Sequence, residues 1–266
     1  MDQTLTAAFL GLLEGLTEFL PVSSTGHLLL AGHFLGFQSD GRTFEVVIQL
    51  GAILALTSVY AGMILRIALR ARHDLAARRT IVSLLLAFLP AVVVGLLARD
   101  FVKTVLFETP VLIAIMLILG GFVLLVIDRK APSPIHYDAT ALPFGKSLAI
   151  GVFQCLALVP GVSRSGATIV GAMLLGVEKR AAAEFSFLLS LPTMGAAVAY
   201  DLFKSRYMLD FGAVWDIAIG FAVAFVTAVL VVRWVLSYIS GNGYALFGWW
   251  RIIVGSAALV AILLGF

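Results

Sequence analysis

The stretch from Glu14 to His27, EGLTEFLPVSSTGH, gathers side chains that could do chemistry inside a very apolar chain. Glu14 and Glu18 are four residues apart, so on a helix they lie on one face, one turn from each other. Two readings are open for this pair. Either they lie near a membrane interface and are simply hydrated, or they face a wet cavity and hold a divalent cation or an arginine. Their hard oxygen ligands favour Mg²⁺ or Ca²⁺ over zinc.

A turn and a second helix are expected to follow these carboxylates. Pro21 disfavours helical geometry at Leu20 and should end the first helix there. A new apolar helix should begin near His27. The residues between are mostly hydroxyl-bearing and are Ser23, Ser24, Thr25 and Gly26. Hydroxyls before a helix serve as N-caps, and free N–H groups at a helix N-terminus attract anions. These hydroxyls therefore either cap the helix alone or also bind a substrate.

Arg164 is the most informative residue in the second half of the chain. It lies at the broken tip of an apolar segment, where it needs an anionic partner. That partner is a carboxylate or a phosphate, both of which a guanidinium binds in bidentate fashion. Ser163 and Ser165 flank it, and Gly166 allows a close approach of the backbone.

If the two broken segments meet, their groups surround one small volume that suits a diphosphate. The arginine and the helix N-termini supply positive charge, a hydroxyl supplies a nucleophile, and His27 could transfer a proton. The alternative for His27 is a buried, hydrogen-bonded histidine with a structural role.

Composition places this chemistry in a membrane. The 266 residues are 61% hydrophobic and 12% charged, with a mean hydropathy of +1.07, whereas soluble domains are about a quarter charged. The apolar runs are long rather than alternating, which favours helices over an outer-membrane barrel. Cys155 is the only cysteine, which excludes an intrachain disulfide. The pI near 9.2 is explained by basic loops, so no nucleic-acid partner is expected. The chain is predicted to be a single all-α membrane domain, 1–266.

Six membrane spans are expected, at 44–65, 81–98, 110–127, 183–203, 213–237 and 248–265. The densest basic loop, 66–80, should be cytoplasmic by the positive-inside rule. Both termini and the loop near 204–211 then face outward, and 128–146 is a second cytoplasmic loop.

The second half of the chain repeats the pattern of the first at an offset of 140. This offset pairs Glu14 with Gln154, Ser23 with Ser163 and Gly26 with Gly166. Each half reads as a re-entrant helix pair followed by three spans, so repeat one (1–128) and repeat two (145–266), joined by a cytoplasmic linker (129–144), should be inverted. Inverted repeats with broken helices bring their polar tips together near the midplane of the bilayer.

Two motifs carry a family resemblance. EGLTEFLPVSSTGH and PGVSRSGAT resemble the signature motifs of the bacterial undecaprenyl pyrophosphate phosphatase family, also called the bacitracin-resistance protein family. The likeness extends through FEVVIQLGAILA (44–55) and over the whole length. Only 66–80 and 128–146 lack a recognisable family pattern.

The resemblance implies hydrolysis of undecaprenyl pyrophosphate, a lipid carrier of cell-wall synthesis, with a divalent cation and bacitracin tolerance as a consequence. It implies an active site opening to the outer face of the bacterial cytoplasmic membrane. It makes Glu14 and Glu18 the acidic residues and Arg164 a phosphate clamp. Ser24 becomes a nucleophile or phosphate ligand, and His27 an acid/base or rival nucleophile. The supporting ligands would be Ser23, Thr25, Gly26, Ser163, Ser165 and Gly166.

The main alternative function is a transporter or flippase of the lipid carrier, because inverted repeats with re-entrant helices are typical of transporters. A structural membrane protein fits the buried charges poorly. The small residues from Gly195 to Ala199 could pack between two copies of the chain, so a homodimer is a further expectation.

Overall fold

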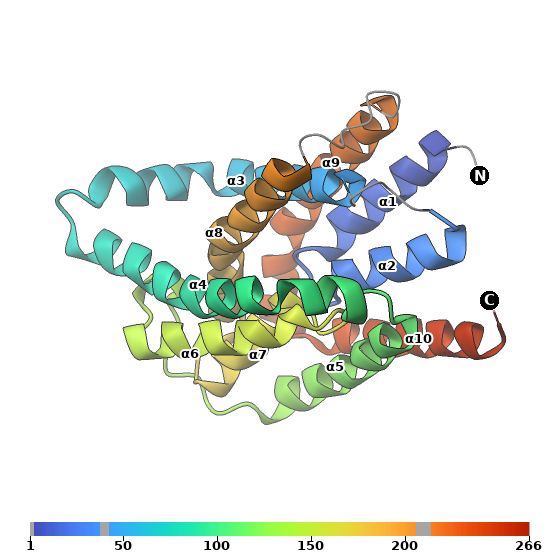
Figure 1. The fold of residues 1–266 in the computed structure, drawn as a ribbon. Helices are drawn as coiled ribbons and strands as arrows, with labels where there is room; N and C mark the ends of the chain where they lie inside the picture. Colours follow the sequence, from blue (N-terminus) through green and yellow to red (C-terminus); the bar gives the residue numbers. More distant parts are fainter. Residues whose placement is uncertain (1–2, 38–42, 206–213, 266) are drawn as a thin grey trace.

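The computed structural model describes residues 3–37, 43–205 and 214–265, and within these ranges the chain folds into helices (Figure 1) without a β-strand. The all-α prediction is therefore confirmed. The main helices are α1 (Gln3–Thr17), α2 (Ser24–Leu35), α3 (Thr43–Arg70), α4 (Leu75–Phe101), α5 (Pro110–Lys130), α6 (Phe144–Gln154), α7 (Arg164–Leu174), α8 (Lys179–Ser205), α9 (Val214–Asn242) and α10 (Ala245–Leu263). Short helical turns are η2 (Val102–Leu106), η3 (Ala139–Ala141) and η4 (Cys155–Leu158).

Six of the described helices, α3, α4, α5, α8, α9 and α10, are long and apolar enough to cross a membrane. They coincide with the six expected spans, and they support a multi-pass membrane protein. The first residue of the span expected at 213–237 lies outside the described residues, and so does most of the expected loop near 204–211. Helix α9 continues to Asn242, five residues beyond the expected end.

The remaining helices form two short pairs, α1–α2 and α6–α7. Helix α1 has 15 residues and α6 has 11, which is less than the ~20 residues that a membrane span needs. Each pair is interrupted by a sharp turn, at 18–23 and at 159–163. These turns carry the motifs singled out in the sequence.

The helix boundaries in the first pair differ from the expected ones. Helix α1 ends at Thr17 rather than at Leu20, and α2 begins at Ser24 rather than near His27. Pro21 has no N–H to continue the helical ladder, so the helix ends before it reaches that residue. Helix α2 begins earlier because the Ser23 side chain caps it.

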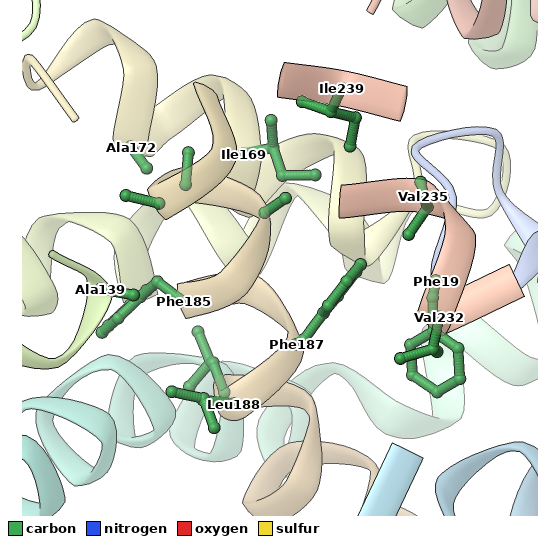
Figure 2. Packing of buried hydrophobic residues seen from close by; sticks show 14 of the residues in the cluster. Phe19, Ala139, Ile169, Ala172, Phe185, Phe187, Leu188, Val232, Val235 and Ile239 are labelled. Atoms are coloured by element: carbon green, nitrogen blue, oxygen red, sulfur yellow. The ribbon is translucent and has the colours of Figure 1, made fainter. Parts of the chain in front are cut away.

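Helix α8 anchors the centre of the fold. It packs against α3, α4, α7 and α9, and Figure 1 shows it crossing between the other helices. Its Phe185, Phe187 and Leu188 join a buried cluster with residues of α7 and α9 (Figure 2). Phe19, from the first turn, packs edge-to-face on Phe187 with ring centroids 5.8 Å apart. This contact fixes the chain between the buried carboxylates and the hydroxyls that follow them.

The short helices pack closely on long helices of the opposite half of the chain, α1 on α9 and α6 on α4. A Cβ added at Gly11 would lie 2.9 Å from the Gly220 Cα, and one at Gly151 would lie equally close to the Ala87 Cα. Real Cβ atoms do not approach a backbone this closely, so each short helix depends on its glycine.

We predict that Gly11→Ala lowers stability by about 1–3 kcal/mol, because the added methyl group must push α1 away from α9. Gly62→Ala is the matched control, since its Cβ would meet nothing within 4 Å and alanine favours a helix. Thermal unfolding of the purified variants in detergent measures the difference. An unchanged melting temperature for Gly11→Ala would contradict the close packing.

Candidate active site

The turns that interrupt the two short helix pairs lie against each other. A Cβ added at Gly26, near the start of α2, would lie 3.3 Å from the Cα of Gly161, which belongs to the turn at 159–163. Ser165 joins them directly, because its Oγ donates to the Leu20 carbonyl at 2.7 Å. Motifs 140 residues apart in the sequence therefore form one site.

Ser23 and Ser163 both have a positive φ, which is unusual for a residue other than glycine, although their ψ angles differ (85° and 122°). Their φ angles are 71° and 80°, and in the described ranges they are the non-glycine residues with a positive φ. Each accepts a hydrogen bond from the N–H three residues on, Ser23 from Gly26 at 3.3 Å and Ser163 from Gly166 at 3.0 Å. Such backbone strain costs of order 1–3 kcal/mol and gathers at functional sites. The serines thus act as N-caps, and each begins a helix at the contact between the turns.

Glu18 links the turns through an ion pair. Its Oε1 lies 3.0 Å from Nη2 of Arg164, and its Oε2 accepts a short hydrogen bond from the hydroxyl of Ser24. The three side chains therefore form a chain in which an arginine orients a carboxylate that in turn accepts from a hydroxyl. This is the arrangement of an orienting group, a base and a nucleophile.

Arg164 is held from behind and keeps one donor free. Its Nη1 donates to the Ser186 carbonyl at 3.1 Å, and its Nη2 also lies 2.9 Å from the sulfur of Met194. Its Nε is buried and has no hydrogen-bond partner in the described part of the chain. Leaving a buried guanidinium N–H without a hydrogen bond costs free energy. An anionic ligand could accept the missing bond from this Nε.

Glu14 is the second buried carboxylate and is 1% exposed. It lies one helical turn before Glu18, whose backbone N–H donates to the Glu14 carbonyl at 2.9 Å, and its Oε1 has no partner among the described residues. No group of three or more His, Cys, Asp or Glu side chains occurs in the described ranges. A closed all-protein metal site is therefore absent there. The pair does fit a cation such as Mg²⁺, which often binds one or two carboxylates and takes its other ligands from phosphates and water.

His27 has both ring nitrogens engaged away from these groups. Its Nδ1 lies 2.8 Å from the Ser23 carbonyl, and its Nε2 lies 2.9 Å from the indole Nε1 of Trp250. A carbonyl only accepts and an indole only donates, so the ring is the neutral tautomer with its proton on Nδ1. The structure thus places His27 behind the first turn, where it holds the carbonyl of the strained serine.

A small polar cavity of ≈ 160 Å³ lies in front of the turns. The residues anticipated from the sequence that line it are Glu18, Ser23, Ser24, Thr25, Ser163 and Arg164. Ser165 and Gly166 are buried beneath it. The arrangement presents a carboxylate, several hydroxyls and a guanidinium to one small ligand.

An apolar groove of ≈ 500 Å³ continues from this cavity between α4, η4 and α8. The two share five lining residues, which are Phe107, Ala157, Arg164, Thr193 and Ala197. The site is therefore amphiphilic, with a polar end at the turns and an apolar extension along the helices.

Comparison with known proteins assigns the chain to a family. Residues 7–257 match the family described as bacitracin resistance protein BacA. The chain belongs to this BacA family. It is 67% identical over 263 residues to an undecaprenyl-diphosphatase of Cereibacter sphaeroides, covering 99% of this chain and 98% of that protein. It is 63% identical to an undecaprenyl-diphosphatase of Paracoccus denitrificans (98% of each chain) and 58% identical to one of Chelativorans sp. (98% of each chain). The resemblance inferred from the two motifs is thereby confirmed.

The sequence did not single out every residue that builds the site of this BacA-family protein. Gln49 and Thr193 line the cavity, and only Gln49 was noticeable, as a polar residue near the start of a span. From α10, Trp250 reaches His27 in α2 and Arg251 reaches Pro21 in the first turn. An arginine inside an apolar span is a signal of function in itself, but nothing in its spacing indicates which groups it contacts.

Proposed function

We propose that this protein hydrolyses undecaprenyl pyrophosphate to undecaprenyl phosphate and inorganic phosphate. The observation that carries the proposal is the junction at Arg164 of a polar, anion-suited cavity with an apolar groove. A diphosphate head fits the first and an isoprenoid tail fits the second. The names of the close relatives support an enzyme over a transporter. Removal of the diphosphate lipid that bacitracin sequesters would make the cell tolerant of that antibiotic.

The chain from Arg164 through Glu18 to Ser24 supports a mechanism with a serine nucleophile. The Ser24 Oγ attacks the terminal phosphorus while Glu18 takes its proton. The anhydride P–O bond breaks, and undecaprenyl phosphate leaves. Water then attacks the phosphorus of the phosphoserine, and the bond between phosphorus and the Ser24 Oγ breaks. Glu18 returns its proton to Ser24, and inorganic phosphate leaves. Arg164, through its unpartnered Nε, stabilises the charge that develops on the phosphoryl oxygens.

Other site residues support the reacting groups. Ser23 and Ser163 hold the two turns, Thr25 offers a hydroxyl to the cavity, and Ser165 ties the second turn to the first. His27 positions the Ser23 carbonyl as a neutral ring. The proposal therefore gives His27 a positioning role in place of proton transfer.

We further propose that Glu14 and Glu18 bind a divalent cation, Mg²⁺ or Ca²⁺, together with the diphosphate. The support is the unpartnered Glu14 Oε1 beside a second carboxylate. The cation would neutralise charge on the phosphate oxygens. Since only two protein carboxylates contribute, phosphate oxygens and water would complete its ligands.

The proposed membrane orientation opens the site to the outer face of the bacterial cytoplasmic membrane. Phe107, in the α4–α5 connection, lines both the cavity and the groove. That connection lies at the same end of the bundle as the start of α1 and the end of α10, opposite the α3–α4 turn (Figure 1). The α3–α4 turn is flanked by Arg70, Arg72, Arg78 and Arg79, which favours the cytoplasm.

We also propose that repeats 1–128 and 145–266 are related as inverted halves of one membrane domain. The support is the positive φ and the helix-capping bond that Ser23 and Ser163 share and the crossed packing of α1 on α9 and α6 on α4. The homodimer stays a prediction.

Purified protein in detergent should release phosphate from undecaprenyl pyrophosphate, and Arg164→Ala should lower kcat/KM by about 10²–10³-fold, because transition-state charge loses its main donor. Arg233→Ala, an exposed arginine of α9, is the matched control and should keep activity. No release by folded wild-type protein would favour a transporter, which has no membrane to act across in detergent.

EDTA should abolish this phosphate release, and excess Mg²⁺ or Ca²⁺ should restore it, because the diphosphate charge needs a cation. Glu14→Gln should raise the Mg²⁺ concentration needed for half-maximal activity, since it removes one of two carboxylates. The assay is a titration of rate against free Mg²⁺. Activity that ignores EDTA would show that the carboxylate pair serves without a metal.

Gly95→Phe should raise KM for undecaprenyl pyrophosphate about tenfold by filling the groove, equivalent to ~1.4 kcal/mol of lost tail binding. Gly95 lines the groove, whereas the matched control Gly62→Phe places the same ring in open space on α3. Hydrolysis of a short-chain prenyl diphosphate should change little in either variant. An unchanged KM for the long substrate in Gly95→Phe would place the tail elsewhere.

A further inference from the structure

Arg251, within α10, is 1% exposed and forms no ion pair with any residue of the described ranges. A buried guanidinium is costly unless its donors are satisfied. All five of its N–H donors are satisfied by backbone carbonyls alone. Nε donates to Leu117 at 3.2 Å, Nη1 to Pro21 at 3.1 Å and Val162 at 2.9 Å, and Nη2 to Met116 at 3.0 Å and Gly161 at 2.6 Å.

Three of these carbonyls belong to the two turns of the site. Pro21 lies in the first turn, and Gly161 and Val162 lie in the second. The other two belong to α5, where the glycine pair Gly120–Gly121 makes room for the side chain. A Cβ at Gly120 would collide with the guanidinium, and one at Gly121 would lie 3.2 Å from the Cβ of Arg251. One side chain thus fastens both turns to the same long helix.

The orientation of these carbonyls fixes the N–H groups on the other side of the turns. In a planar trans peptide, the C=O of one residue and the N–H of the next point in opposite directions. The Val162 carbonyl points to Arg251, so the Ser163 N–H points away from it. That N–H has no partner in the described part of the chain, and Gly161 and Ser163 both line the polar cavity.

We infer that Arg251 is a positioning residue, which holds the carbonyl side of both turns so that the Ser163 N–H faces the phosphate oxygens of the substrate. The inference rests on the proposed hydrolysis. Arg251 does not touch the substrate; it acts through the peptide units that it holds. The planar fork of arginine is needed, because an ammonium offers three donors from one point and cannot reach five carbonyls.

The test compares Arg251→Lys, Gly120→Ala and the matched control Gly62→Ala. Gly120→Ala leaves every charge in place but displaces the guanidinium. Each purified variant is assayed in detergent for kcat and KM with undecaprenyl pyrophosphate, for the inhibition constant of inorganic phosphate, and for its melting temperature.

Arg251→Lys and Gly120→Ala should each lower kcat about tenfold or more, as loss of a positioned donor does, and should weaken inhibition by phosphate. KM should change less, since the apolar groove is untouched. A double variant that combines Arg251→Lys with Gly120→Ala should have a kcat no lower than that of the slower single variant, because both changes break the same contact. Gly62→Ala should match the wild type.

Wild-type kcat and phosphate inhibition in folded Arg251→Lys would overturn the inference, as would a lowered melting temperature with unchanged kcat, which indicates a purely structural role. If Arg251→Lys does not fold, the kcat and the phosphate inhibition constant of Gly120→Ala test the inference in its place. Failure of the wild-type protein to hydrolyse the lipid would instead overturn the proposed function.

Discussion

The site depends on the ion pair between Glu18 and Arg164, because each charge comes from a different turn. In apolar surroundings, a buried charge without its partner costs several kcal/mol, and breaking such a pair is strongly destabilising. Neither turn can therefore keep its charge buried unless the other turn lies against it. The hydrogen bond from the Ser165 hydroxyl to the Leu20 carbonyl also holds the two turns together. The ion pair between Glu18 and Arg164 therefore both arranges the side chains of the site and holds the two halves of the chain together.

Each of the two turns ends in a serine that caps a helix, but the turns differ in charge. Ser23 and Ser163 both have a positive φ and both cap a helix in the same way, yet Ser24 follows the first and Arg164 follows the second. Glu14 of α1 likewise has no acidic counterpart in α6, where Gln154 lies at the offset of 140. One half thus supplies the acids and the hydroxyl, and the other supplies the cation. These differences give the site two chemically different sides, although both turns cap a helix with a serine.

The sequence was sufficient to predict what hydropathy and residue type determine. The six long helices, the two broken pairs, and the need of Arg164 for an anionic partner follow from these. The start of α2 at Ser24 was missed because three consecutive hydroxyl residues could each cap a helix, and residue type does not show that Ser23 is the one that does. The contacts of Arg251 were missed because its partners are backbone carbonyls, which every residue has. The hydroxyls and acids near His27 in the sequence favoured proton transfer, whereas the contact with Trp250, 223 residues away, could not be read from the sequence.

The charges of the site also explain why a cation belongs in the proposed reaction. The ionised carboxylate of Glu18 already offsets the charge of Arg164, and the donors of Arg251 are taken by backbone carbonyls. A diphosphate adds at least two negative charges to this apolar region, where uncompensated charge is expensive. Helix N-termini and free N–H groups supply only partial charges. In the proposed reaction, a divalent cation that arrives with the diphosphate would remove the excess, and the unpartnered oxygen of Glu14 is the protein atom that we propose as its ligand.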